Sequence, residues 1–188
     1  TDQKPTPLAQ QLEGKPTRPH WERIGTQKRF GVCVPLFSLR SERDFGVGDT
    51  ADIRGMVDWC REIGASVLQI LPVNDMGSGA EPYSALSAFA LDPLYLALDE
   101  FPGAADDPAW IERIRKEGAE FNKASRVEAR IVRWRKMELA HEWYSQYSNA
   151  LLKHVMTNFT EESLLENYLL YRVIKEVEEF RSWEDWRD

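Results

Sequence analysis

The sequence predicts an α/β fold that opens with one βαβ unit and continues into helices. Two short, nearly continuous apolar runs lie at residues 30–37 (FGVCVPLF) and 66–73 (SVLQILPV). Such runs are typical of strands that are buried on both faces of a parallel sheet. An amphipathic segment separates them, and strand, helix and strand at this spacing form a right-handed βαβ unit. After residue 107 the apolar positions recur with helical periodicity.

A crossover helix is expected between the two strands. Asp49 is a favourable N-cap, and Asp52 lies three residues later at the positive end of the helix dipole. Gly64 stands where a C-terminal glycine cap belongs. One apolar face recurs at spacings of three and four, and it consists of Ile53, Met56, Val57, Cys60 and Ile63.

Residues 1–27 are rich in proline and polar side chains, and we expect them to form an N-terminal arm. Farther along, Asp107 and Pro108 have the pattern of an N-cap followed by a first-turn proline. Two longer helices are predicted at residues 127–156 and 161–180. The expected core positions of the second are Leu164, Leu165, Tyr168, Leu169, Tyr171 and Ile174.

The composition indicates a globular protein and makes several function classes poor candidates. Of 188 residues, 43% are hydrophobic and 29% charged, with a formal net charge of −7. An acidic chain is poorly suited to nucleic acid, which is bound through Lys and Arg. No run approaches the ~18 apolar residues of a membrane span. His20, His141 and His154 are scattered and fit no metal-binding pattern. We therefore expect no nucleic-acid partner, no membrane partner and no metal.

The two cysteines, Cys33 and Cys60, are too few for a disulfide framework. We expect both to be buried thiols in a reducing compartment. The first residues have no apolar core and so do not form a signal peptide, which makes the cytoplasm the expected location. The chain begins with Thr1 rather than Met, as in a processed or partial polypeptide.

A glycine-containing segment, DFGVGD, precedes the crossover helix. Gly46, Gly48 and Ala51 nominally fit the looser dinucleotide-binding fingerprint. That fingerprint requires its first glycine directly after the strand, whereas residues 38–45 intervene here. Asp49 would also place a carboxylate where a pyrophosphate must bind. The pattern therefore favours two glycines that shape a loop before a capped helix.

A long loop, residues 74–92, follows the second strand, and loops at this end of parallel strands are usual sites of function. It carries an aromatic pair, Tyr83 and Phe89, and two hydroxyls, Ser84 and Ser87. An aromatic face with polar groups beside it suits a sugar ring. The alternative is that Phe89 and Leu86 anchor the loop to the barrel while Tyr83 packs locally, and the residue types alone do not decide between the two.

Three acids in or beside this loop, Asp75, Glu81 and Asp92, could in principle form the close carboxylate pair of a glycosidase. Surface acids are common, so this interpretation is the weaker one. Near the C-terminus, Trp183 and Trp186 could form an aromatic clasp, although packing is the commoner role of tryptophan.

Five sequence blocks occur in an order that resembles the opening of glycoside hydrolase family 77, the 4-α-glucanotransferases. The resemblance is dense over residues 28–101 and looser afterwards, where the two tryptophans resemble a Trp-x-x-Trp element. The blocks are FGVCVPLFSLRS at residues 30–41, FGVGD at 45–49, VDW at 57–59, LQILPVND at 68–75 and PYSALSAFA at 82–90.

The resemblance implies a (β/α)8 TIM barrel with helical insertions, in which this chain supplies the first βαβ unit and a largely helical insertion subdomain. It implies an enzyme that transfers 1,4-α-glucan segments between maltooligosaccharides or to glucose by retaining double displacement, without a cofactor. The family's Asp nucleophile, Glu acid/base and further Asp belong to later strands. The resemblance therefore implies no catalytic residue in this chain.

The resemblance also implies that the loop contacts the acceptor sugar, through the tyrosine that matches Tyr83 and through its neighbours. The expected substrate-binding residues are Tyr83, Ser84, Ser87, Asp75 and Glu81. Two positions depart from the family pattern, which usually has Ser before Pro-Tyr and Asn-Pro after the Ser-Ala-Phe block. Here they are Glu81 and Asp92, and a sugar contact made by that Ser is in doubt.

The expected organisation has three parts: an arm at residues 1–27, the first βαβ unit with the acceptor-side loop at 28–101, and a helical subdomain at 102–188. The expected partners are α-1,4-glucans and the remainder of the barrel. Two other function classes stay open at this point. One is a stand-alone carbohydrate-binding or scaffold module, and the other is a nucleotide-dependent oxidoreductase based on the glycine pattern.

We predict that this chain alone is catalytically silent, because double displacement needs two carboxylates that the resemblance assigns to later strands. Incubation with maltotriose, followed by measurement of glucose and longer glucans, checks this. Turnover well above a buffer blank would contradict the prediction.

Overall fold

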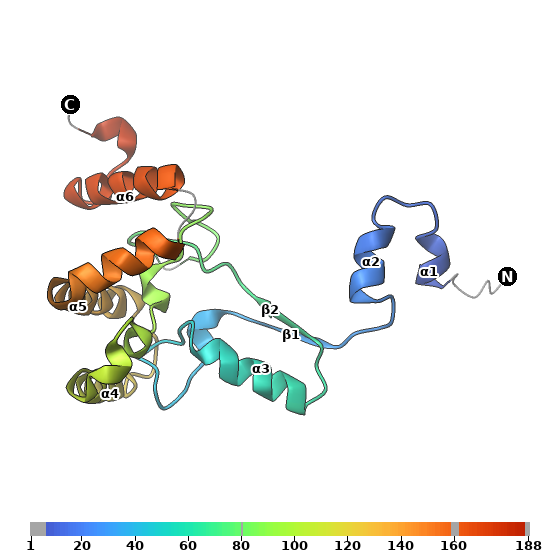
Figure 1. Ribbon diagram of the computed structural model, residues 1–188, viewed down its shortest axis with the longest axis horizontal. Coiled ribbons are helices and arrows are strands. Elements are labelled where there is room, and N and C mark those ends of the chain that lie inside the picture. Colours follow the sequence, from blue (N-terminus) through green and yellow to red (C-terminus); the bar gives the residue numbers. More distant parts are fainter. Residues whose placement is uncertain (1–6, 80, 159–161, 187–188) are drawn as a thin grey trace.

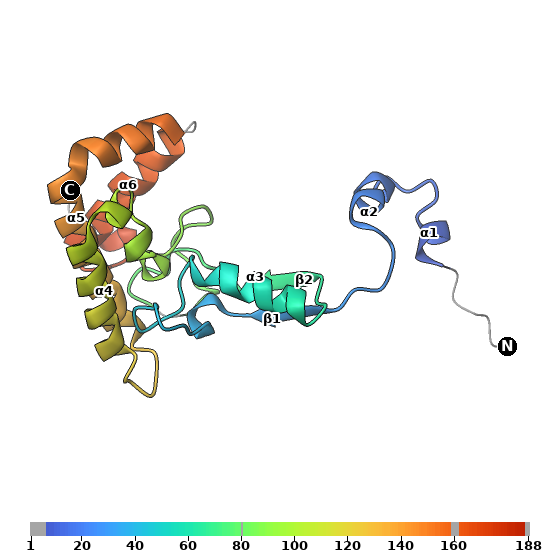
Figure 2. The same cartoon turned by 60° about the horizontal axis from the view of Figure 1, so that its bottom comes forward.

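The computed structural model describes residues 7–79, 81–158 and 162–186, with backbone alone at 149–158 and 162–165. Strands β1 (Gly31–Val34) and β2 (Val67–Ile70) pair in parallel, with Gly31 opposite Val67. Helix α3 (Asp52–Glu62) connects them and lies beside the pair (Figures 1 and 2). The predicted strand–helix–strand unit is therefore confirmed, and the rest of the described fold is largely helical.

The expectation that both strands are buried on both faces is wrong for this chain. Along β1 and β2 exposed residues alternate with half-buried ones. Cys33 is exposed, contrary to expectation, whereas Cys60 of α3 is buried as expected. The physical reason is that the described residues supply only two strands and one covering helix, so no further strand or helix covers the rest of the sheet.

Asp49 and Asp52 shape the start of α3 in a reciprocal arrangement. The helix begins at Asp52, with Ala51 rather than Asp49 in the capping position. Asp49 Oδ1 accepts a hydrogen bond from Ala51 N at 2.9 Å, and Asp52 Oδ2 accepts one from Asp49 N at 2.9 Å. The two carboxylates thus satisfy backbone donors that have no partner within the helix. Gly64 follows the helix with a φ of +76°, as expected of a glycine cap.

The helical part consists of α4 (Pro108–Phe121), α5 (Ala129–Asn158) and α6 (Glu162–Val177). Asp107 caps α4 as predicted, since its Oδ1 accepts from Trp110 N at 3.0 Å. Within α5 the backbone kinks at Tyr147. Short 3-10 turns connect or end these segments, at Leu36–Ser38, Pro93–Tyr95, Leu98–Glu100, Ala104–Asp106 and Trp183–Asp185.

The predicted N-terminal arm contains two short helices, α1 (Leu8–Gln11) and α2 (Arg18–Ile24). Both figures show these helices set apart from α4, α5 and α6, with the strands and α3 between (Figures 1 and 2). None of the residues of either helix is buried. Among the described residues of the arm, Leu12 after α1 is buried, but it takes no part in the main hydrophobic cluster.

The hydrophobic core lies where the segments after each strand meet α4 and α5. Trp143 of α5 stacks on Tyr147 at 4.1 Å between ring centroids and contacts Trp110 of α4 at 4.7 Å. Phe45, from the glycine-containing segment, contacts Phe121 at 5.0 Å. Further buried members are Leu36, Val47, Met76, Leu94, Tyr95, Leu98, Ala104, Ile114, Val132 and Leu139.

The predicted core face of α6 is only partly correct. Leu169 is 50% exposed, and Tyr168, Tyr171 and Ile174 are half-buried. Leu164 and Leu165 lie outside the described side chains. Among the described side chains of this helix, the buried ones are instead the cations Arg172 and Lys175.

The tryptophans near the C-terminus differ in their surroundings. Trp186 packs against Tyr171 with ring centroids 5.6 Å apart, and Lys175 Nζ lies 6.0 Å from the Trp186 ring centroid. Trp183 is 67% exposed. Packing therefore accounts for Trp186, and the two rings do not share one environment.

We predict that the 188-residue chain is a marginal folding unit that self-associates through its strands. A two-stranded parallel sheet has unpaired edges, which are templates for pairing with other chains. Sedimentation at several concentrations, combined with chemical denaturation, tests this. A stable monomer that unfolds in one cooperative transition would contradict the prediction.

Candidate functional site

The loop at residues 74–92 leaves the C-terminal side of β2 and returns to its own starting point. Asn74 and Leu91 form an antiparallel bridge. Beside it, Asp75 N donates to Ala90 O and Asp92 N donates to Val73 O, both at 2.9 Å. The two ends of the loop are therefore hydrogen-bonded to each other, and this fixes the position from which the tip of the loop projects.

At the tip, a turn presents Tyr83 to solvent. Ser84 N donates to Glu81 O at 3.1 Å, which closes a four-residue turn with Pro82 as its second residue. Proline fixes φ at that position, which favours such turns. Tyr83 is 76% exposed, and both Glu81 and Ser84 are exposed beside it. Three of the five predicted substrate-binding residues therefore share one accessible turn.

The predicted aromatic pair is not in contact. Phe89 is 81% exposed, and the ring contacts within the described residues do not include one between Phe89 and Tyr83. These exposures are at odds with Phe89 as an anchor of the loop and with local packing of Tyr83. Leu86, the other expected anchor, is half-buried, and its side chain lies against Gly77.

Ser87 shapes the backbone of the loop. Its hydroxyl oxygen accepts hydrogen bonds from Phe89 N at 3.1 Å and from Ala90 N at 3.0 Å. The side chain is half-buried. Because both contacts are local, they fix the turn that leads back to the loop base.

Asp75 lies inside the molecule, away from the exposed tip. Its carboxylate is fully buried. Oδ1 accepts from Gly77 N at 2.8 Å, whereas Oδ2 accepts from the Tyr168 hydroxyl at 2.7 Å and lies 2.8 Å from Arg172 Nε. Burial, together with the hydrogen bond to Asp75, raises the pKa of Tyr168. The predicted sugar-contact set is therefore divided between a surface turn and a buried anchor.

Asp92, at the other end of the loop, is also buried. Its two oxygens accept from Arg133 Nε at 2.8 Å and from Arg133 Nη2 at 3.0 Å. They also accept from Met76 N and Leu94 N. Each buried acid thus has its own arginine, so Asp75, Glu81 and Asp92 do not form a glycosidase-type carboxylate pair.

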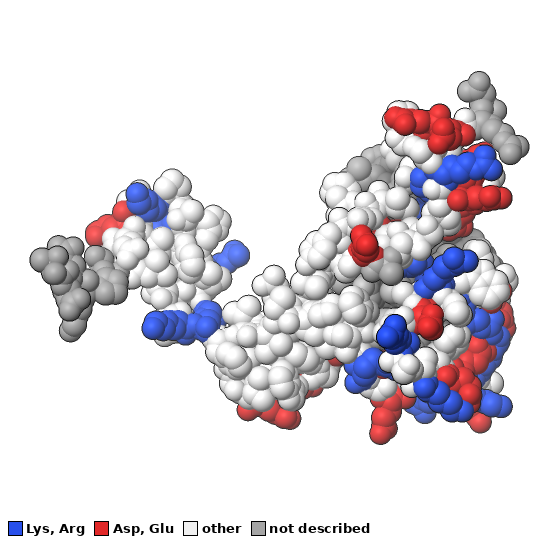
Figure 3. Space-filling model, turned by 180° about the vertical axis from the view of Figure 1, so that it is seen from behind, with Lys and Arg blue, Asp and Glu red and all other residues white. Residues whose placement is uncertain are grey.

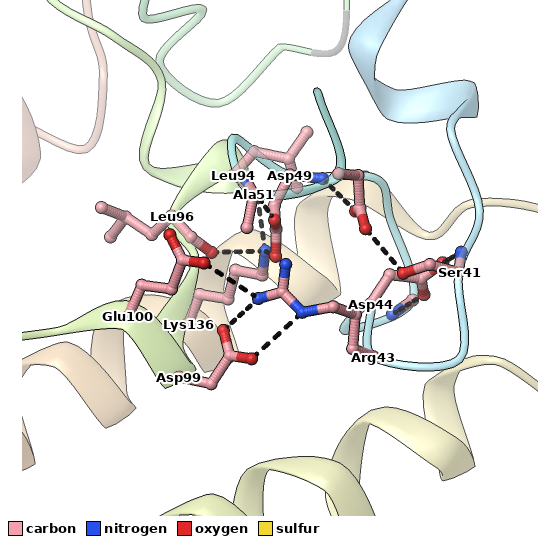
Figure 4. A network of polar contacts seen from close by, with 12 residues as sticks. Ser41, Arg43, Asp44, Asp49, Ala51, Leu94, Leu96, Asp99, Glu100 and Lys136 are labelled. Atoms are coloured by element: carbon pink, nitrogen blue, oxygen red, sulfur yellow. Dashed lines mark hydrogen bonds and ion pairs between the residues drawn. The ribbon is translucent and has the colours of Figure 1, made fainter. Parts of the chain in front are cut away.

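Lys136 of α5 is fully buried near the glycine-containing segment (Figure 4). Its Nζ donates to Leu94 O at 2.9 Å and to Leu96 O at 2.8 Å, and lies 4.0 Å from Asp49 Oδ2. Burial lowers the pKa of Lys136 to about 8, although the charge of Asp49 opposes this. Burial likewise raises the pKa of Asp49 to about 6, opposed by Lys136.

The glycines of this segment serve packing. Gly46 has a φ of +76°, and a Cβ there would lie 2.6 Å from Phe121 Cβ. A Cβ at Gly48 would lie 2.2 Å from Leu39 O and 2.3 Å from Leu36 O. Asp49 is buried beside Lys136, so a carboxylate already lies where the pyrophosphate of a nucleotide would have to bind. The geometry therefore speaks against the dinucleotide interpretation.

A groove of about 780 Å³ opens between the start of the loop, α5 and α6. The sequence analysis did not identify this groove. Four of its α5 residues nevertheless recur at spacings of three and four: Arg130, Trp134, Met137 and His141. Arg133 leaves one buried Nη1 without a hydrogen bond within the described residues, whereas Arg172 Nη1 lies 3.0 Å from Glu176 Oε1. The lining includes Gly77, Ser78, Arg130, Trp134, Met137, His141 and Phe180.

The remaining surface carries no single-sign patch on the face that Figure 3 shows. Lys and Arg are interspersed with Asp and Glu over the helical part, and the region of the strands is mostly uncharged (Figure 3). Among the described residues, no group of three His, Cys, Asp or Glu side chains is placed to hold a metal ion. No helix in the described ranges is long and apolar enough to cross a membrane.

Comparison with known proteins gives a consistent family. The family model for 4-alpha-glucanotransferases, glycoside hydrolase family 77, matches residues 34–188. A 4-alpha-glucanotransferase of Chlamydia trachomatis is 40% identical over 124 residues, which cover 66% of this chain and 23% of that protein. Another, from Chlamydia caviae, is 33% identical over 169 residues, covering 87% of this chain and 32% of that protein.

The chain belongs to glycoside hydrolase family 77, the 4-alpha-glucanotransferases. Its match covers the N-terminal portion of its homologues. The matched region of the chain spans 23% and 32% of the length of these two relatives.

We predict that Lys136 makes the stability of the protein rise with pH in alkaline solution. The pKa of about 8 in the folded state lies below the ordinary 10.5. Between these values the unfolded state binds more protons than the folded state, so the free energy of unfolding increases with pH. Urea unfolding at several pH values should show this increase for the wild type and not for Lys136→Met. Parallel pH profiles of the two proteins would contradict it.

Proposed function

We propose that this chain forms the N-terminal part of a retaining 4-α-glucanotransferase and supplies its acceptor-side loop. The family membership supports a TIM-barrel fragment, in which residues 28–101 are the first βαβ unit and residues 102–188 a helical insertion. In such barrels the active site lies at the C-terminal ends of the strands. The loop at 74–92 leaves β2 on that side.

The observation that supports this proposal best is the exposure of Tyr83 on a closed, proline-containing turn. A tyrosine ring offers a flat apolar face for a sugar and a hydroxyl for its rim. The exposed Ser84 hydroxyl and Glu81 carboxylate add polar groups beside it. Because the loop base is already hydrogen-bonded, a sugar can bind this turn at little cost in conformational entropy.

In this proposal the chain contributes acceptor binding, and the remainder of the barrel contributes bond cleavage. None of Asp44, Asp49, Asp75 and Asp92 matches a catalytic position of the family. Asp75 and Asp92 serve as loop anchors through their arginines. The proposed substrates are the α-1,4-glucans that the family implies. The remainder of the barrel holds the transferred segment, and the acceptor sugar lies against the Tyr83 turn.

We predict that Tyr83→Ala, in the polypeptide that also contains the catalytic strands, weakens transfer to short acceptors. The expected loss is about 1–2 kcal/mol in kcat/KM, the scale of a lost hydrogen bond with stacking. Cleavage of the donor should change less, because Tyr83 carries no carboxylate. The melting temperature should stay constant, since a side chain so exposed stabilises little. Separate donor and acceptor kinetics measure the two steps.

Tyr144→Ala is the matched control, because Tyr144 is an exposed tyrosine that lies on α5 rather than in the loop. It should leave acceptor kinetics unchanged. Tyr83→Phe separates the ring from the hydroxyl and should retain the stacking part of the effect. Equal losses of donor and acceptor steps in Tyr83→Ala, together with a lower melting temperature, would favour a packing role and refute the acceptor role.

A further inference from the structure

Helix α6 holds the loop at residues 74–92 through one buried carboxylate. Tyr168 and Arg172 lie four positions apart and therefore on the same face of the helix. Both reach Asp75 Oδ2, the hydroxyl at 2.7 Å and the guanidinium Nε at 2.8 Å. The two partners are far away in sequence, with Tyr168 lying 93 residues after Asp75. One residue of the loop is thus fixed by two side chains of the helical part.

Asp75 is also the residue that organises the loop internally. Its Oδ1 accepts from Gly77 N at 2.8 Å, its carbonyl oxygen accepts from Leu86 N at 2.6 Å, and its own N–H donates to Ala90 O at 2.9 Å. These contacts reach both limbs of the loop. A shift of Asp75 would therefore displace the backbone on each side of the exposed turn.

The opposite end of the loop has a matching anchor on α5. Arg133 binds both oxygens of Asp92, and Asp92 Oδ2 also accepts from Met76 N at 2.9 Å. The second anchor therefore reaches back to the residue next to Asp75. Both arginines and both acids are buried, so water competes little for these contacts and they are correspondingly directional.

The exposed turn has few contacts of its own. Tyr83 is 76% exposed, so its position depends on the frame below it rather than on packing at the tip. Displacements of about 1 Å in a binding group are enough to lower reaction rates substantially. The contacts at the base of the loop therefore determine the position of Tyr83.

We propose that Tyr168 and Arg172 are positioning residues for acceptor use: by holding Asp75 they fix the loop that presents Tyr83. They do not touch the sugar. This inference rests on the proposed function for its kinetic part, whereas the structural part concerns the loop alone.

The test uses Tyr168→Phe in the polypeptide that contains this chain and the catalytic strands, because this change removes one hydroxyl and keeps the ring. Amide hydrogen exchange at Gly77 and Leu86 should accelerate, since both amides bond to Asp75. KM for a short acceptor such as glucose should rise by ~10-fold, the effect of one charged hydrogen bond, while cleavage of the donor stays near the wild-type rate.

Tyr171→Phe is the matched control, because Tyr171 lies on the same helix and contacts Trp186 rather than Asp75. It should change neither exchange nor KM. Arg172→Lys retains a cation and should restore part of the protection that Arg172→Met loses. Unchanged exchange at Gly77 and Leu86 in Tyr168→Phe overturns the proposal, as does an equal loss of donor and acceptor steps.

The two proposals fail in different ways. A wild-type polypeptide without transfer activity would refute the proposed function, and amide exchange in the same protein would still decide whether α6 fixes the loop. If Arg172→Met proves too unstable to measure, Tyr168→Phe and Arg172→Lys decide. Faster exchange at both amides in Tyr168→Phe supports the loop-fixing role, and wild-type exchange in it overturns that role.

Discussion

Buried ion pairs and charged hydrogen bonds join the helical part of the chain to the segments that follow the strands. Arg133 and Lys136 come from α5 and Arg172 from α6, and each meets an acid or backbone carbonyls of the strand-proximal segments. Removing one partner of such a contact leaves a buried group without compensation, which costs far more than the pair contributes. The loop, the core around Leu94 and the start of α3 all depend on these contacts being complete.

Local sequence signals predicted the elements well. The two apolar runs gave both strands, Asp107 and Pro108 gave the start of α4, and Gly64 gave the end of α3, because each of these depends on neighbouring residues alone. The burial of the strands was not predictable in the same way. It depends on how many further strands and helices cover them, and the sequence pattern of β1 is that of a covered strand although Cys33 is exposed here.

The candidate site divides along the same line. Pro82 favours a turn at Tyr83 locally, but the residue types left open whether the Tyr83 ring is exposed or packed. The placement of Asp75 could not be anticipated, since its partners Tyr168 and Arg172 lie on a distant helix. An aspartate in a loop looks the same in sequence whether it faces a ligand or an arginine. Asp75 and Asp92 also explain how a long loop keeps one shape, because each end is tied to a different helix.

Asp75 pairs with Arg172 and Asp92 pairs with Arg133, and these two pairings restrict how this family branch can diverge. An uncharged residue at position 75 would leave the buried guanidinium of Arg172 without its carboxylate partner. An uncharged residue at position 172 would likewise leave the buried carboxylate of Asp75 without its cation. Each pair is therefore expected to be exchanged as a unit, and joint replacement at positions 75 and 172 or at 92 and 133 should mark lineages in which the loop at residues 74–92 has taken a different form.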